Sequence, residues 1–267
     1  MPINFFIQGP FNRLEESELF VFFKHVNFYM AFFDRKSPWI FIDNHSKNHE
    51  TYKVPCLFNI NKEFPSQINA TPINSDLLDL FSIARSAYTP RLQYLFYFQV
   101  LEFAAYYFIE HEFTNKIKGI IKNPDLLLQI DKYSKELIDE LQNKYYKNNS
   151  DSARLEKVIT RYCSYNKIRH ELRENKEYFM TDVEFEGGFK LKKLFDKEGQ
   201  IESELPNIMR TIKDNIEKIR NVLVHVRECH ENKVILPTPQ NDALIKPYLY
   251  LLRRIAEEVA IKQEILS

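Results

Sequence analysis

Glycine is scarce in this chain, which has five glycines among 267 residues. Glycine is the residue that most readily takes up the backbone conformations of tight turns. So few of them fit a helical protein with few tight turns. Apolar residues make up 44% of the sequence, and the 22 phenylalanines and 15 tyrosines indicate a globular core rather than a disordered chain.

Cysteine is also rare. Cys56, Cys163 and Cys229 lie far apart and form no CxxC pair, which suits reduced thiols in a cytosolic protein better than a disulfide framework. The N-terminus lacks a basic region followed by an apolar run, so we expect no signal peptide. The most apolar run, residues 94–109, is too short to cross a bilayer and contains Glu102. We therefore expect a soluble cytoplasmic protein with no membrane partner.

An excess of charge of either sign is missing as well, because 37 Lys and Arg residues balance 37 Asp and Glu residues. This balance argues against a strongly basic, non-specific nucleic-acid binder, since attraction to phosphates grows with positive charge. It leaves room for a small local site. The acidic residues are scattered rather than clustered as in a two-metal nuclease, and no glycine-rich phosphate loop occurs. We expect no metal or other cofactor.

The first part of the chain, residues 1–74, reads differently from the rest. Residues 19–23, 26–33 and 39–42 are aromatic or β-branched runs of strand length, and turn-forming residues bound the last two. They predict a small β-rich or mixed N-terminal domain. Residues 16–25 could equally form a short helix, because apolar runs of this length are ambiguous.

From residue 75 to residue 267 the pattern is helical, with capping residues and prolines at the expected starts. The predicted helices begin near Ser75 and span about residues 90–116, 123–144, 151–168, 205–228 and 242–262. Gly187 and Gly188 mark a loop or hairpin tip. Long antiparallel helices with short links form a bundle. The predicted fold class is therefore mainly α, an antiparallel helical bundle with a small β-containing N-terminal domain.

The most informative segment lies late in the helix predicted over residues 205–228. Its apolar residues recur at a 4-3-4-3 spacing that keeps them on one buried stripe: Ile212, Ile216, Ile219, Leu223 and Val226. At about 100° per residue, Asn221 and His225 fall on the opposite side of the helix and Arg220 on its flank. A His and an Asn one turn apart can share a ligand, and a long Arg can reach the same point. These three residues offer a cation, an amide and a proton-transfer group, which resembles what metal-free phosphodiester cleavage needs.

The order Arg220, Asn221, three further residues and His225 resembles the Arg-x4-6-His motif of the HEPN superfamily, in which a polar residue directly follows the Arg. The aromatic-rich segment 91–102 is similar to the opening helix of many HEPN proteins. Together the likeness covers about residues 76–264. The resemblance implies a helical bundle that dimerises so that two motif helices meet in a shared cleft.

The resemblance also implies an activity, which is metal-independent RNA cleavage through attack by the adjacent 2′-hydroxyl. In that reaction His225 would move a proton, Arg220 would hold the scissile phosphate, and Asn221 would orient His225 or the substrate. DNA lacks the attacking hydroxyl and should resist. Members of the superfamily typically act as toxins or in phage defence. The implied partners are RNA, a second copy of the chain, and an antitoxin or regulatory protein.

Other interpretations stay open. His225 could simply be solvated, with Arg220 paired to a nearby carboxylate such as Glu217 or Glu228. The bundle could also serve as a binding or dimerisation module without catalysis, because a fold does not dictate an activity.

Further charged or metal-ligating groups carry weaker signals. His225, Cys229 and His230 could suggest a zinc site, but the sequence offers no evident fourth ligand. Basic residues that could contact an RNA backbone, but more typically form solvated surface, are Arg253, Arg254, Lys190, Lys192 and Lys193. Residues 169–171 have the pattern of an ordinary charged helix face.

Overall fold

The computed structural model describes residues 15–38, 40, 67, 68, 70–146, 150–225 and 233–262 of the chain. The chain divides into two compact units, Met1–Thr51 and Tyr52–Ser267. The sequence instead predicts a division before Ser75, which is the first residue of a helix and lies within the second unit. The mainly α prediction is confirmed, since helices dominate the described residues and the strands among them are two residues long.

The first unit contains helix α1 (Glu16–Phe33) where two strands were predicted over residues 19–23 and 26–33. The strand prediction was wrong, whereas the alternative of a helix over residues 16–25 is confirmed, and the reason is local. A capping box starts the helix, because the Glu15 amide donates to the Glu18 carboxylate at 3.0 Å and the Glu15 side chain accepts in return. Phe, the commonest apolar residue of this run, is enriched in strands, so the capping box rather than the composition distinguishes the helix. The third predicted strand, residues 39–42, lies largely outside the described residues.

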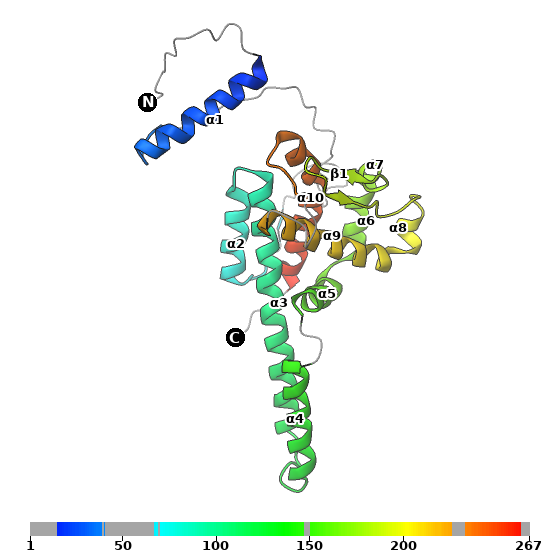
Figure 1. Ribbon diagram of the computed structural model, residues 1–267. Helices are drawn as coiled ribbons and strands as arrows, with labels where there is room; N and C mark the ends of the chain where they lie inside the picture. Colours follow the sequence, from blue (N-terminus) through cyan, green and yellow to red (C-terminus); the bar gives the residue numbers. More distant parts are fainter. Residues whose placement is uncertain are drawn as a thin grey trace. The chain divides into compact units, whose positions relative to one another are not determined.

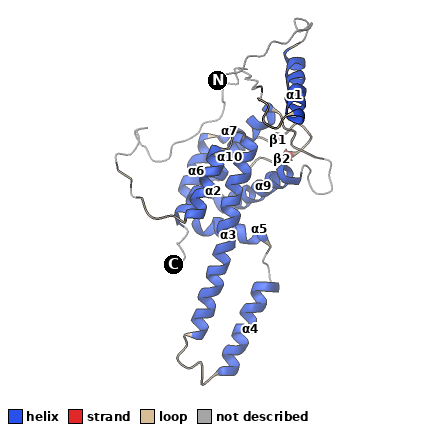
Figure 2. Ribbon diagram, turned by 90° about the vertical axis from the view of Figure 1, so that its left-hand side faces the viewer, coloured by secondary structure: helices blue, strands red, loops and turns tan. Residues whose placement is uncertain are grey.

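The second unit carries the remaining elements (Figure 1). In chain order they are α2 (Ser75–Ser86), α3 (Pro90–Ile121), α4 (Ile130–Tyr146), α5 (Asp151–Tyr162), α6 (Tyr165–Glu174), α7 (Lys176–Phe179), β1 (Val183–Glu184), β2 (Lys190–Leu191), α8 (Gln200–Ser203), α9 (Leu205–His225) and α10 (Pro239–Lys262). The first half of α3 packs among α2, α5, α9 and α10. Its second half extends with α4 as a helical hairpin away from those helices, in both views (Figure 1 and Figure 2).

Local signals set the starts of α2 and α3 as the sequence predicts. The side chain of Asn74 accepts a hydrogen bond from the Asp76 amide at 2.9 Å, and that of Thr89 accepts one from the Leu92 amide at 3.3 Å. Pro90 occupies the first position of α3, where a missing N–H costs nothing. The helix then runs five residues beyond its predicted end at Lys116 to Ile121.

Two predicted helices differ from the structure. The helix expected from residue 123 begins at Ile130, because Asp125 instead organises a turn in which its carboxylate accepts from the Tyr133 hydroxyl at 2.7 Å. The helix expected over 151–168 breaks at Cys163, whose backbone is extended. Ile159 and Ile168 are nine residues apart, which would place them about 180° apart on one continuous helix. The break lets both residues reach the core, where each is buried.

The predicted hairpin tip is confirmed. Val183 pairs with Leu191 across β1 and β2, and the turn between them places Gly187 at φ 106° and Gly188 at φ 85°. Glycine adopts this left-handed backbone without strain. A Cβ on Gly187 would also lie 2.5 Å from the Val234 carbonyl oxygen, so the turn needs glycine there for space as well.

The core forms around the stripe predicted on α9. Ile212, Ile216 and Ile219 are fully buried, Leu223 is half-buried, and Val226 lies outside the described residues. The apolar residues of α10 that recur at helical spacing are buried as well, apart from the half-buried Leu244: Ile245, Tyr248, Leu251, Leu252, Ile255 and Val259. Among the described helices, none combines the length and the apolar character that spanning a bilayer would require.

Candidate functional site

Side chains at one-turn intervals on α3 contact residues at the same interval on α9, and these contacts fix the position of Arg220. Tyr94, Phe98 and Glu102 follow one another at one-turn intervals on α3 and meet Ile216 and Arg220, one turn apart on α9. The Tyr94 hydroxyl donates to the Ile216 carbonyl at 3.1 Å. Burial raises the pKa of Tyr94 well above its usual value, so this hydroxyl keeps its proton. The two helices are thereby held in register next to the candidate site.

The guanidinium of Arg220 has three neighbours. Its Nη2 donates to Glu102 Oε1 at 2.7 Å, its Nη1 donates to Asn221 Oδ1 at 3.1 Å, and its Cζ lies 5.4 Å from the centre of the Phe98 ring. The ion pair is only partly sheltered, because the side chain of Arg220 is 29% exposed and that of Glu102 is 44% exposed. Arg220 therefore does not pair with Glu217, one of the partners considered from the sequence; Glu228 lies outside the described residues.

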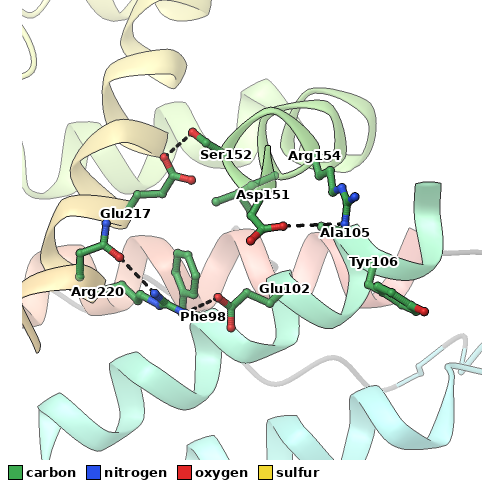
Figure 3. Close-up of a pocket in the computed structure, with 11 residues that line it drawn as sticks. Phe98, Glu102, Ala105, Tyr106, Asp151, Ser152, Arg154, Glu217 and Arg220 are labelled. Carbon is green, nitrogen blue, oxygen red and sulfur yellow. Dashed lines mark hydrogen bonds and ion pairs between the residues drawn. The ribbon is translucent and has the colours of Figure 1, made fainter. Parts of the chain in front are cut away.

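Arg220 and Asn221 line a cavity of about 570 Å³ between α3, α5 and α9 (Figure 3). This volume falls within the range of small-molecule pockets. The charged groups on its wall are the carboxylates of Glu102, Asp151 and Glu217 and the guanidiniums of Arg154 and Arg220. Opposite charges pair within the wall, as Arg154 lies 3.8 Å from Asp151 and Arg220 lies 2.7 Å from Glu102.

His225 is the last residue of α9 and lies one helical turn beyond Asn221. Both residues are exposed, which confirms the prediction that they occupy the side of the helix away from the core. His225 is not part of the cavity wall, whereas Arg220 and Asn221 are. The structure thus brings two of the three predicted residues into one cavity and leaves the third on the adjoining exposed face, next to Val224, which is 46% exposed.

A polar cluster beside the cavity was not predicted from the sequence. Lys213 Nζ donates to Ser152 Oγ at 2.6 Å, and Ser152 Oγ donates to Glu217 Oε2 at 2.7 Å. A Ser and a Lys in contact can form a nucleophile and its base when the Lys is neutral. Burial works to lower the pKa of Lys213, but its hydrogen bonds with Asp214 and Glu217 outweigh burial and raise that pKa. Lys213 therefore stays protonated, and the cluster holds α5 against α9 rather than activating Ser152.

The charged helix face predicted over residues 169–171 is partly wrong, because Glu171 is buried. Its side chain is 5% exposed and accepts a hydrogen bond from Arg254 Nε at 2.9 Å. Burial raises the pKa of Glu171 to about 7, against the opposing effect of Arg254. The sequence gives no local sign of this, since an acidic residue in a helix is usually on the surface.

Four of the five basic residues considered as RNA contacts are engaged within the protein, and the fifth, Lys192, is exposed. Arg254 bonds Glu171 and Glu257, and Arg253 pairs with Glu257 at 2.9 Å. Lys190 pairs with Glu184 at 2.8 Å and Lys193 with Asp196 at 2.6 Å. These pairs leave fewer uncompensated cations for a nucleic-acid backbone than the sequence pattern alone indicates.

Two of the three residues of the zinc alternative, Cys229 and His230, lie outside the described part of the chain. Within that part, no three metal-ligating side chains cluster.

Comparison with protein-family models, with curated proteins and with solved structures gives no match to this chain.

Proposed function

We propose that this chain is a metal-independent endoribonuclease of the HEPN type that acts as a homodimer. One observation carries the proposal. Arg220 and Asn221 stand side by side on the wall of a cavity of about 570 Å³, and His225 is exposed one helical turn beyond Asn221. The fold around them is mainly helical, which supports the resemblance to HEPN proteins.

The proposed reaction is an internal transesterification of RNA. The 2′-oxygen attacks the adjacent phosphorus, a bond from phosphorus to that oxygen forms, and the bond to the 5′-oxygen breaks. His225 accepts the proton of the 2′-hydroxyl or delivers one to the leaving 5′-oxygen, because an imidazole ring can both accept and donate a proton. Arg220 binds the phosphoryl oxygens through its N–H donors, and Asn221 orients the substrate or His225. The products are a 2′,3′-cyclic phosphate and a 5′-hydroxyl.

The proposal of a homodimer rests on the exposed face of α9. Asn221 and His225 lie on this face together with Val224, an apolar residue that is 46% exposed. A second copy packing its own α9 there would cover Val224. It would also bring two Arg and two His side chains into one cleft, so that a histidine outside the cavity wall could act on a phosphate held inside it.

The deciding experiment is RNA cleavage in the presence of a chelator by the wild type, His225→Ala and Arg220→Ala. Arg210→Ala is the matched control for the arginine, because Arg210 lies on the same helix with a side chain 68% exposed and pairs with Glu156 at 3.4 Å. His170→Ala, on α6, is the control for the histidine. We expect both controls to cleave and both site variants to lose at least about 100-fold in rate, which is the usual contribution of a general acid or base for His225 and of a donor that stabilises developing charge for Arg220.

Product chemistry provides an independent check. The reaction should leave 2′,3′-cyclic phosphate ends, and an oligonucleotide with deoxyribose at the scissile position should stay intact. Equal cleavage by the wild type, His225→Ala and Arg220→Ala, with all three proteins folded, would remove the catalytic assignment.

We further propose that the nuclease acts as a toxin or a phage-defence effector held in check by an antitoxin or regulatory protein. Expression of the active protein should then slow the growth of the host, and expression of His225→Ala should not. Normal growth with soluble wild-type protein would argue against a toxin that acts without a trigger.

A second candidate function is a catalytically silent module of the same fold, used for binding or dimerisation. The pairing of Arg220 with Glu102 at 2.7 Å favours it, because this contact neutralises the cation that catalysis needs. It predicts no cleavage under any condition and a dimer or complex that survives both His225→Ala and Arg220→Ala.

A further inference from the structure

We propose that Glu102 is an electrostatic latch on Arg220, which keeps the guanidinium from RNA until a phosphate displaces the carboxylate. This inference rests on the proposed nuclease function and concerns how the same cavity is regulated. The sequence shows Glu102 only as a charge that interrupts an apolar run. The structure places it, 118 residues before Arg220, in direct contact with that side chain.

The packing of α3 against α9 fixes the backbone of Glu102 and leaves its carboxylate accessible to solvent. Glu102 is two turns along α3 from Tyr94, whose hydroxyl bonds α9 at the Ile216 carbonyl. Phe98, between them, lies under the guanidinium of Arg220. The carboxylate therefore starts from a fixed point on α3, yet its side chain is 44% exposed and can turn toward solvent (Figure 3).

The charges on the cavity wall determine how a phosphate that enters the cavity is received. Its wall carries three carboxylates and two guanidiniums, a formal charge of −1. Glu217 is compensated by Lys213 at 3.1 Å, and Asp151 lies 3.8 Å from Arg154. Glu102 therefore takes up the positive charge of Arg220, and a phosphate entering beside that arginine meets a carboxylate within a few ångströms.

A phosphate can readily displace Glu102, because the guanidinium of Arg220 directs only some of its N–H donors to that carboxylate. Of the five N–H donors of an arginine, one is directed to Glu102 and one to Asn221. A phosphodiester offers two acceptor oxygens that match the guanidinium geometry. Since a partly exposed ion pair contributes little stability, exchange of the carboxylate for a phosphate costs little free energy.

The test measures binding rather than cleavage, with a short, fully 2′-O-methylated oligoribonucleotide that cannot be cut. Glu102→Gln keeps the size and hydrogen-bonding oxygen of the side chain and removes its charge. We expect it to tighten binding about tenfold, the size of a partly screened charge repulsion at short range. Glu102→Asp, which keeps the charge, should bind within about threefold of the wild type. A role in packing alone would be disturbed at least as much by the shorter Asp as by Gln.

Asp151→Asn provides the matched charge control, because it removes a carboxylate from the same wall without touching Arg220. We expect it to tighten binding about twofold or less. Adding Arg220→Ala to Glu102→Gln should abolish the gain, since the latch acts only through that arginine.

The outcomes separate the two proposals. Equal affinities for Glu102→Gln and the wild type, with weaker binding by Arg220→Ala, would overturn the latch and leave the nuclease proposal standing. An equal gain from Asp151→Asn and Glu102→Gln would show general repulsion and also overturn it. If neither the wild type nor Glu102→Gln binds the oligoribonucleotide, both proposals fall.

Discussion

Among the arginine–glutamate pairs that join different helices of the second unit, two differ in burial rather than in distance. Arg254 of α10 lies 2.9 Å from Glu171 of α6, with side chains 15% and 5% exposed. Arg220 of α9 lies 2.7 Å from Glu102 of α3, with side chains 29% and 44% exposed. A short contact therefore does not reveal what a pair does. The buried pair cannot exchange its partners for water, whereas the exposed pair can exchange one partner for a ligand.

The buried pair is part of a network that the fold depends on. Arg254 also bonds Glu257, which in turn bonds Arg253. Removing two charges from water is costly, and the mutual attraction offsets that cost only while both partners are present. Burial raises the pKa of Glu171 to about 7 in spite of Arg254, which shows how strongly this position disfavours a charge.

The largest effect is expected when the buried pair is broken. Arg254→Ala leaves Glu171 and Glu257 without their shared cation, and we expect it to lower the free energy of unfolding by about 4 kcal/mol at pH 8. Urea unfolding followed by circular dichroism measures this. Arg210→Ala, at a site 68% exposed, should change it by less than about 0.5 kcal/mol. A loss below about 1 kcal/mol for Arg254→Ala would show that the two pairs are alike after all.

A smaller effect is expected from pH, through Glu171 alone. Its pKa in the folded protein, about 7, is above the usual value of a glutamate. The folded state therefore holds a proton that the unfolded state has lost, so this group's contribution to stability is complete at acidic pH and is lost as pH rises through 7. The side chain in Glu171→Gln does not titrate, so this variant lacks that pH dependence. The free energy of unfolding of the wild type, relative to Glu171→Gln, should fall on the order of 3 kcal/mol between pH 4 and pH 8. A constant difference would mean that Arg254 keeps Glu171 charged throughout.

The features that the sequence predicts correctly are those set by near neighbours. Thr89 and Pro90 start α3, the glycines at 187 and 188 form the hairpin tip, and the period of the isoleucines identifies the buried face of α9. That period also places Asn221 and His225 on the exposed face. The catalytic roles of these residues stay predictions, because exposure does not test them.

The features that the sequence misses depend on contacts between distant segments. Glu171 resembles a surface residue until α10 brings Arg254 beside it, and Glu102 meets Arg220 only after α3 and α9 have packed. The break at Cys163 likewise follows from the core, since Ile159 and Ile168 must face it from two helices. The error in α1 is of a different kind. An aromatic run of strand length is compatible with either structure, and a capping box at Glu15 favours the helix.

The smallest effect on stability is expected at the exposed pair. A double-mutant cycle of Glu102→Gln and Arg220→Ala should give a coupling energy below about 1 kcal/mol, because a partly exposed pair gains little over its separate hydration. The coupling should shrink further as salt is raised from 0.05 to 0.5 M, since added ions screen exposed charges. Urea unfolding of the four proteins measures it. A coupling of about 3 kcal/mol that does not respond to salt would place Glu102 and Arg220 in the same class as Glu171 and Arg254. The guanidinium would then be a structural group committed to its carboxylate, and neither exchange with a phosphate nor catalysis by Arg220 would follow.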